Sequence, residues 1–144
     1  EQAISGREIE CAVLDARQGR SLLAGAPGEI VVHAADRFYD YAAKYVDNTA
    51  VELICPAKLP DSVSQRIRSI ALAAFTALGC EGLARVDFFW DTAKDSLLIN
   101  EVNTMPGFTP YSLYARMMAE VGWPYNKLVG ELIELALDRP VGLR

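Results

Sequence analysis

Two strand-like runs close to each other in the chain constrain the fold more than any other feature. They are Leu83–Asp91 and Ser96–Val102, and only Thr92-Ala93-Lys94-Asp95 separates them. Two β-type runs joined by so short a connection predict an antiparallel hairpin. Placing the centre of this hairpin near Lys94 sets Asp87 opposite Glu101 and Arg85 opposite Asn103.

This register predicts that polar side chains converge on one face at one end of the hairpin. Residues two apart on a strand share a face, and so do directly opposed residues. The converging side chains are Arg85, Asp87, Glu101 and Asn103. The other face then carries a core layer of Val86, Phe88, Trp90, Leu98 and Val102. A slip of one residue would destroy this arrangement, so the register is the assumption to check.

Two carboxylates and an amide oxygen on one patch form a set of hard oxygen ligands, which suits Mg²⁺. A cation next to carboxylates is the usual arrangement for phosphoryl transfer, because the metal neutralises the phosphates. Arg85 beside it would hold a phosphate or a developing oxyanion. The alternative is a solvated acidic face with Arg85 in a surface ion pair. The loop after the second strand favours the phosphate-binding interpretation over the plain acidic face. Gly107 allows a ligand to approach the backbone, and Ser112 begins the next predicted helix, whose N-terminus favours anions.

The rest of the chain predicts an α+β fold. Further strands are expected at residues 8–14, 21–24, 29–33 and 50–55, and helices at 61–78, 112–121 and 126–137. The first of these helices carries an apolar face of Val63, Ile67, Ile70, Ala74 and Leu78, and Gly79 is its expected stop. Strands in antiparallel groups with helices between them define the class. Residues 34–49 hold several tyrosines without a clean period, and either a functional loop or a plain surface loop accounts for them.

Composition excludes several classes of function. The net charge of −5 argues against a nucleic-acid or anionic-membrane surface, and no apolar run approaches the roughly 20 residues of a membrane span. The chain shows no signal-peptide pattern. The three cysteines, Cys11, Cys55 and Cys80, form no C-x-x-C pair, which favours reduced thiols in a cytosolic protein. The single histidine, His33, has no partner histidine for a metal site. Phosphate-binding P-loop and G-x-G-x-x-G motifs are absent from the sequence.

Three motifs resemble the C-terminal half of the D-alanine–D-alanine ligase family, which has the ATP-grasp fold. They are Gly82–Phe89, Asn100–Thr109 and Tyr111-Ser112-Leu113. Residues 38–45 are similar to the mobile loop of that family, and Gly6–Glu10 is similar to its nucleotide-contacting strand. The resemblance implies that residues 1–144 form an ATP-grasp C-terminal domain, an antiparallel sheet with flanking helices. The family's N-terminal domain and most of its central domain would lie outside this sequence, and this piece alone is expected to be inactive.

The resemblance also implies roles for the residues of the hairpin and of the loop after it. Asp87, Glu101 and Asn103 would bind two Mg²⁺ ions, with Mn²⁺ as a possible substitute. Arg85 would contact phosphate and the tetrahedral oxyanion, and the Gly107 N–H would complete the oxyanion hole. The Ser112 hydroxyl would hold the carboxylate of the second D-alanine. Ala115 stands where the family commonly has proline, which should alter only the stiffness of the loop.

The remaining implied roles concern the nucleotide. Lys44 would reach the transferred phosphate, and Tyr45 would close the mobile loop over the site. Glu8 would bind the ribose hydroxyls, while the backbone of Gln2 and Ile4 would meet the adenine. Two further residues are assigned to the nucleotide site, Glu1 and Asn100.

The implied activity is ATP-dependent ligation of two D-alanines through an acyl phosphate, for peptidoglycan precursors. The partners are then ATP and D-alanine in a cytoplasmic homodimer. Tyr45 favours dipeptide formation over formation of a D-alanyl-D-lactate ester. Two alternatives stay open: a D-alanine–D-lactate or other ATP-grasp carboxylate–amine ligase, and a non-catalytic nucleotide-binding domain.

Overall fold

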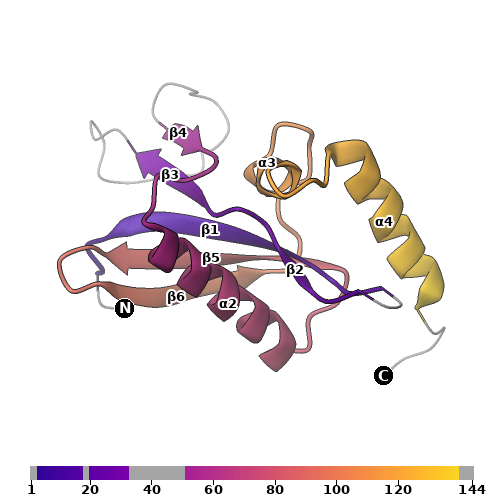
Figure 1. Cartoon of the computed structure of the whole chain (residues 1–144), viewed down its shortest axis with the longest axis horizontal. Coiled ribbons are helices and arrows are strands. Elements are labelled where there is room, and N and C mark those ends of the chain that lie inside the picture. The colour runs from indigo at the N-terminus through magenta and orange to yellow at the C-terminus, as the bar shows by residue number, and fades with distance from the viewer. Residues whose placement is uncertain (1–2, 18–19, 33–50, 140–144) are drawn as a thin grey trace.

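A single antiparallel sheet forms the centre of the molecule (Figure 1). The computed structural model describes residues 3–17, 20–32 and 51–139. In these residues the sheet has six strands, every paired neighbour is antiparallel, and the order is β4-β3-β1-β5-β6 with β2 as a further partner of β1. The strands are β1 (Arg7–Leu14), β2 (Leu23–Ala24), β3 (Gly28–Val32), β4 (Val51–Ile54), β5 (Leu83–Asp91) and β6 (Ser96–Asn103). The predicted α+β class is confirmed.

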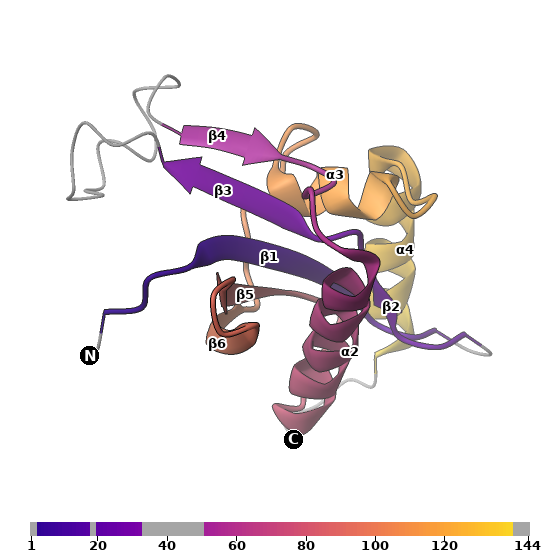
Figure 2. The same ribbon diagram turned by 60° about the vertical axis from the view of Figure 1, so that its left-hand side comes forward.

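In the described part of the chain, three helices cover the two faces of this sheet. Figure 2 shows α2 (Asp61–Ala77) on one face, and α3 (Leu113–Ala119) with α4 (Tyr125–Asp138) on the other. The alternation of side chains along β1 explains both layers. Ile9, Cys11 and Val13 are buried in the α2 core, whereas Ala12 and Leu14 are buried in the core under α3 and α4.

The apolar face of α2 differs in part from the expected one. Its buried residues recur every four positions, at Val63, Ile67, Ala71 and Phe75. Leu78, which was expected to face the core, is 65% exposed. The reason is that the helix ends at Ala77, and Gly79 then turns the chain with a φ of 62°, a conformation that favours glycine.

The β5–β6 hairpin contains a register shift that the sequence reading did not include. Near the turn, Asp91 pairs with Ser96 and Phe88 pairs with Ile99. Asn100 is then an extra residue in β6, so the ladder continues with Asp87 opposite Glu101. Such a bulge reverses which positions of a strand face the core.

The expectation that Leu98 belongs to the core layer is therefore wrong. Leu98 is 42% exposed, and its neighbour Leu97 packs against the α2 core instead. Leu97 lies opposite Trp90, so both side chains face α2. The other expected members of the layer do lie in or against that core: Val86, Phe88, Trp90 and Val102.

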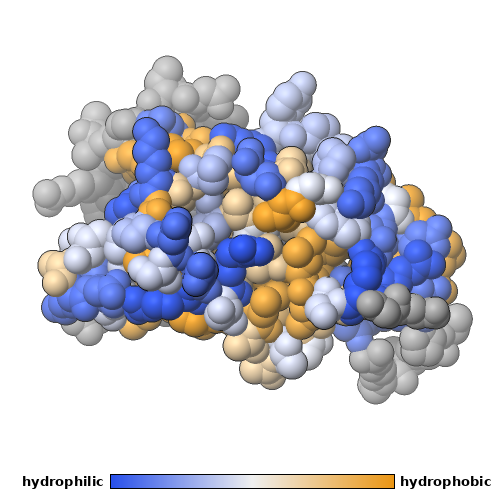
Figure 3. Space-filling model, in the orientation of Figure 1, coloured by the Kyte–Doolittle hydropathy of each residue, from blue (hydrophilic) through white to orange (hydrophobic). Residues whose placement is uncertain are grey.

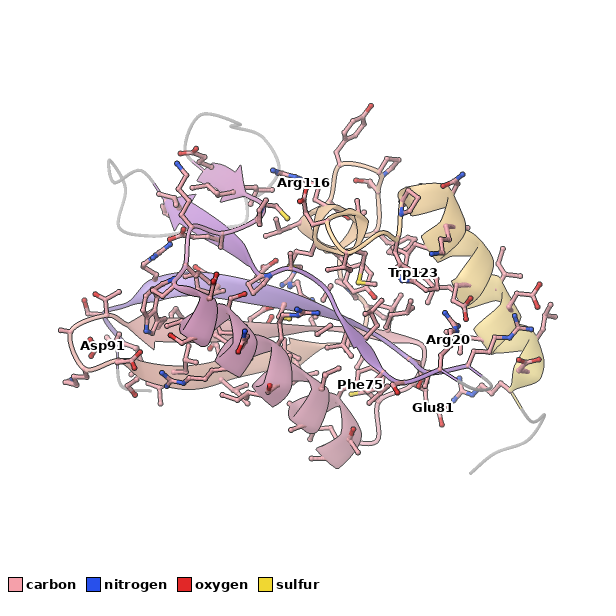
Figure 4. All side chains as sticks on the ribbon, in the orientation of Figure 1. Arg20, Phe75, Glu81, Asp91, Arg116 and Trp123 are labelled. Carbon is pink, nitrogen blue, oxygen red and sulfur yellow. The ribbon has the colours of Figure 1, made fainter. Side chains whose placement is uncertain are left out.

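Charged and aromatic side chains attach α4 to the turn between β1 and β2. Figure 4 shows Arg20 beside Trp123, and the Arg20 guanidinium carbon lies 5.0 Å from the ring centroid. Arg20 also pairs with Glu131 of α4. Arg17 adds ion pairs to two further acids of α4, Glu134 at 2.8 Å and Asp138 at 2.7 Å.

The face seen in Figure 1 separates polar from apolar surface. Apolar side chains gather around the C-terminal half of α2, whereas the turn end of the β5–β6 hairpin is hydrophilic (Figure 3). Across the described ranges, we find no helix with both the length and the apolar character required to cross a bilayer.

Candidate functional site

Three acidic side chains form one row across neighbouring strands of the sheet. Glu10 of β1 lies opposite Asp87 of β5, and Asp87 lies opposite Glu101 of β6. Opposed residues share a face, so all three carboxyl groups belong to the face that α3 and α4 partly cover. Arg85 lies on the same face two residues before Asp87, opposite Asn103. The predicted pairing of Asp87 with Glu101 and of Arg85 with Asn103 is confirmed.

This face of β1 changes character along its length. Ala12 and Leu14 pack under α3 and α4, while Glu8 and Glu10 continue the same face toward the beginning of the strand. The polar row therefore starts where the helical cover of the sheet ends. A cleft of about 360 Å³ lies at the opposite end of β1, beside Asp15 and α4, and holds none of these residues.

Arg85 is the centre of the polar row. Its Nε donates to Asp87 Oδ1 at 2.8 Å, and its Nη2 donates to Asp87 Oδ2 at 2.7 Å. Its Nε also lies 3.2 Å from Glu10 Oε1, and its Nη2 lies 4.0 Å from Glu101 Oε1. One guanidinium thus lies near three carboxyl groups, and its two-pronged bond to Asp87 is a strong kind of such pairing.

Burial shapes the protonation of this cluster. It raises the pKa of Glu10 to about 8, and the charge of Arg85 only partly opposes this rise. Burial also raises the pKa of Asp87, against the hydrogen bond and the charge of Arg85. For Arg85, burial lowers the pKa, but the hydrogen bond to Asp87 and the surrounding carboxylates outweigh this and raise it, so Arg85 stays charged.

Glu10 is the site residue that sequence reasoning missed. Glu10 lies in the strand expected at residues 8–14 and received no role in the site, yet it is only 2% exposed. Its Oε2 has no hydrogen-bond partner among the described residues. Its position in the sequence could have indicated burial, because Glu10 lies on the same face of β1 as Glu8 and two residues closer to the apolar residues of that face.

The donor atoms suit a divalent cation, although their present arrangement does not form a ligand set. Among the described residues, no group of three or more His, Cys, Asp or Glu side chains is placed to hold a metal ion. The reason at this site is that both Asp87 oxygens are bonded to Arg85. Three carboxyl groups surround one arginine, and one Glu10 oxygen is unpartnered among the described residues, so oxygen atoms are available here for a hard cation.

The loop after β6 borders the polar row. Asn103 Oδ1 accepts a hydrogen bond from the Met105 N–H at 2.9 Å, which fixes the direction of the chain as it leaves the strand. At Gly107, an added Cβ would meet no other atom within 4 Å. Packing within the described protein therefore does not require glycine at this position.

Ser112 caps α3, as expected of a residue at the start of that helix. Its Oγ accepts from the Ala115 N–H at 3.4 Å and donates to the Thr109 carbonyl at 2.9 Å. The next residue, Leu113, packs directly over Gly28 of β3, where an added Cβ would lie 2.8 Å from Leu113 Cδ1. The absence of a side chain at Gly28 therefore sets how closely the start of α3 approaches the sheet.

The structure describes only some of the residues expected to bind the nucleotide. Glu8 lies next to the polar row on β1, Ile4 is exposed just before that strand, and Asn100 is the extra residue of the bulge. The other four expected residues lie outside the described ranges: Glu1, Gln2, Lys44 and Tyr45.

Comparison with known proteins identifies the family. A family model described as "D-ala D-ala ligase C-terminus" matches residues 1–134. The chain therefore belongs to the family of D-alanine–D-alanine ligase C-terminal domains. A protein of Kineococcus radiotolerans named D-alanine–D-alanine ligase is 53% identical over 146 aligned residues, which cover 100% of this chain and 39% of that protein. The chain thus spans well under half the length of the curated relative it matches.

Solved structures agree with this result. The D-alanine–D-alanine ligase of Coxiella burnetii matches with a TM-score of 0.76 and 40% identity, over 96% of this chain and 34% of that one. A D-alanine–D-alanine ligase of Bacillus anthracis, solved in complex with ATP, matches with a TM-score of 0.72 and 28% identity, over 95% of this chain and 40% of that one. The domain is thus of the ATP-grasp type expected from the motifs.

Proposed function

We propose that this chain is the C-terminal ATP-grasp domain of a longer ligase that joins two D-alanines at the expense of ATP. The observation that carries the proposal is the row of Glu10, Asp87 and Glu101 around the half-buried Arg85, beside the loop that leads to Ser112. This arrangement combines oxygen ligands for a cation with a fixed positive charge for phosphate, which is what phosphoryl transfer needs. The product would be D-alanyl-D-alanine for peptidoglycan precursors.

We assign the metal and phosphate roles to the hairpin. Asp87, Glu101 and Asn103 would hold Mg²⁺, or Mn²⁺ in its place. A bound divalent cation neutralises phosphate charge and polarises the phosphoryl group. Arg85 would then donate its N–H groups to the transferred phosphate and later to the oxyanion.

The loop and the start of α3 would bind the second amino acid. The Gly107 N–H would complete the oxyanion hole, and the lack of any packing reason for glycine there agrees with a ligand that approaches the backbone closely. Ser112 would donate its hydroxyl hydrogen to the carboxylate of the second D-alanine, in place of its present bond to the Thr109 carbonyl.

The nucleotide roles rest on the family alone, because several of these residues lie outside the described ranges. Glu8 would bind the ribose, and Ile4, Glu1, Gln2 and Asn100 would border the nucleotide. Lys44 would reach the transferred phosphate, and Tyr45 would cover the site.

The chemistry proceeds in two balanced steps. The carboxylate oxygen of the first D-alanine attacks the γ-phosphorus of ATP, so that an acyl phosphate forms and ADP leaves. The amine of the second D-alanine then attacks the acyl carbon, loses a proton and displaces inorganic phosphate. Arg85 and the Gly107 N–H stabilise the oxyanion between these two events.

The test is a ligase assay on the complete protein that contains these residues, with ATP, Mg²⁺ and a panel of second nucleophiles. We expect phosphate release that depends on D-alanine, together with formation of the dipeptide. Preference for D-lactate or for another amine would favour the alternative ligases. Nucleotide binding without any turnover would favour a non-catalytic domain. We also propose a cytoplasmic homodimer, which sedimentation of the complete protein and cell fractionation would test.

A further inference from the structure

One buried oxygen has no role in the site as described above. Glu10 is 2% exposed, and its Oε1 lies 3.2 Å from Arg85 Nε. Its Oε2 has no hydrogen-bond partner in the described part of the chain. Leaving a buried carboxylate oxygen unsatisfied is unfavourable, so such a group calls for a physical explanation.

The explanation lies in how Arg85 divides its hydrogen bonds. Both Asp87 oxygens are taken up by Arg85, at 2.8 and 2.7 Å. To serve as a metal ligand, Asp87 has to give up at least part of this pairing. Arg85 would then lose its main partner while its side chain is only 20% exposed, and an unpaired buried charge is strongly unfavourable.

Of the two other carboxyl groups near Arg85, Glu10 rather than Glu101 is placed to replace Asp87. Glu101 lies 4.0 Å away, is 57% exposed in its side chain, and belongs to the proposed ligand set itself. Glu10 faces Arg85 from β1, has one oxygen near Nε and keeps the other unused. A carboxylate with one oxygen engaged and one free can become a two-pronged partner of an arginine.

We propose that Glu10 is a positioning residue that takes over the Arg85 guanidinium when Asp87 turns its carboxylate toward a metal–nucleotide complex. This inference rests on the proposed function. It assigns Glu10 no contact with substrate. Glu10 keeps Arg85 charged, paired and in place while Asp87 changes partners.

The opposite neighbour of Arg85 in β1 supports this assignment. In the ladder between β1 and β5, Arg85 lies opposite Ala12, which is fully buried and has no polar side-chain atom to compete for the guanidinium. Glu10 is thus the nearest acceptor that β1 offers on this face, since Glu8 lies two residues further along, opposite Phe89.

The test measures ADP binding by the complete ligase, by calorimetry, once with Mg²⁺ and once with a chelator. Glu10→Gln keeps the size of the side chain and one acceptor oxygen but replaces the second oxygen by an amide, so it cannot form a two-pronged carboxylate pair with Arg85. We expect it to weaken ADP binding in Mg²⁺ by about tenfold, because Arg85 then keeps hold of Asp87, and to leave binding in the chelator unchanged. Glu29→Gln is the matched control, since Glu29 is also a buried carboxylate paired with an arginine of this sheet, Arg7. We expect it to bind ADP like the wild type in both conditions.

A second pair of variants separates positioning from simple loss of charge. In an Arg85→Met background, Asp87 is already free, so adding Glu10→Gln should change ADP binding in Mg²⁺ by less than about twofold. A general electrostatic effect of Glu10 would persist in that background and would overturn the proposal. If Glu10→Gln does not fold, Glu10→Asp keeps the charge but shortens the side chain, and it should weaken binding in Mg²⁺ in the same direction.

The outcomes distinguish this inference from the function on which it rests. Wild-type protein that binds no ADP with Mg²⁺ would contradict the proposed function itself. Wild-type binding that Glu10→Gln leaves unchanged would overturn the inference alone. Equal weakening in Mg²⁺ and in the chelator would also overturn it, because it would show that Glu10 only supports the fold.

Discussion

Asp87 of β5 lies directly opposite Glu101 of β6, although the register set at the hairpin turn would place Asn100 there. The ladder pairs Phe88 with Ile99 and then skips Asn100. Without this bulge, Glu101 would oppose Val86, whose side chain is in the α2 core. The extra residue therefore decides that the second carboxylate joins Arg85 and Asp87 instead of facing α2.

Glu101→Gln should lower turnover at least about 100-fold, because it removes a proposed metal ligand. The side chain of Glu101 is 57% exposed, so we expect the free energy of unfolding to change by less than about 0.5 kcal/mol. Ligase assays and denaturant titrations on the same preparation provide both values. Asp95→Asn is the matched control: Asp95 is an exposed acid of the same hairpin, paired with Arg66, and its φ of 48° is one that asparagine tolerates. Full activity of Glu101→Gln would contradict the assignment.

Gly28→Ala should disturb the start of α3. The new Cβ would lie 2.8 Å from Leu113 Cδ1, and Leu113 is held in the core under α3 and α4. We expect a loss of about 1–3 kcal/mol in unfolding free energy, as for an overpacked core. Since Ser112 precedes Leu113, the KM for the second D-alanine should rise more than the KM for ATP. Equal changes in both KM values would argue against Ser112 as the carboxylate-binding residue.

Gly107→Ala provides the complementary case. No atom lies within 4 Å of the added Cβ, so the unfolding free energy should stay within about 0.5 kcal/mol of the wild type. Turnover should nevertheless fall, because the methyl group would obstruct a ligand that approaches the Gly107 N–H. A variant with wild-type turnover would remove Gly107 from the oxyanion hole.

Glu10→Gln should stabilise the fold increasingly as the pH rises. Burial raises the pKa of Glu10 from 4.5 to about 8 in the folded protein. Between these two pH values the folded state holds a proton that the unfolded chain has released. Raising the pH therefore lowers the free energy of unfolding of the wild type, and this decrease is complete above about pH 8. Glutamine cannot ionise, so the variant escapes this loss of stability, which is on the order of 5 kcal/mol at alkaline pH for a pKa that rises from 4.5 to about 8.

Urea titrations of both proteins from pH 4 to pH 9 measure this difference. A stability difference that does not depend on pH would contradict the raised pKa of Glu10. A variant that is more stable yet binds Mg²⁺ and ADP less well would show that Glu10 is kept for function at a cost in stability.

The sequence predicts much of this site because strand alternation and pairing are local rules. The hairpin and the pairing of Asp87 with Glu101 followed from two short runs and their spacing. The register assumed from a turn centred at Lys94 was correct for the site end of the hairpin but shifted by one residue near the turn, where Leu98 consequently faces away from the core. A bulge depends on the competition between turn geometry and core packing along the whole ladder, which spacing alone does not contain.

The face of β1 that carries Glu10 can be read from the sequence, but its membership of the site cannot. Its place in the row requires knowledge that β1 pairs with β5, two strands separated by β2, β3, β4 and α2 in the chain. Long-range pairing of this kind is not encoded in the local pattern of either strand. The motif residues, in contrast, lie within one hairpin and the loop after it, so their spacing already brings them together.

The most direct test is a crystal structure of the complete ligase with Mg²⁺ and a non-hydrolysable ATP analogue. We expect a cation about 2.1 Å from oxygens of Asp87 and Glu101, with Arg85 paired to Glu10 and reaching the terminal phosphate. A nucleotide bound elsewhere, with both Asp87 oxygens still on Arg85, would contradict the assignment of the row as the metal–nucleotide site.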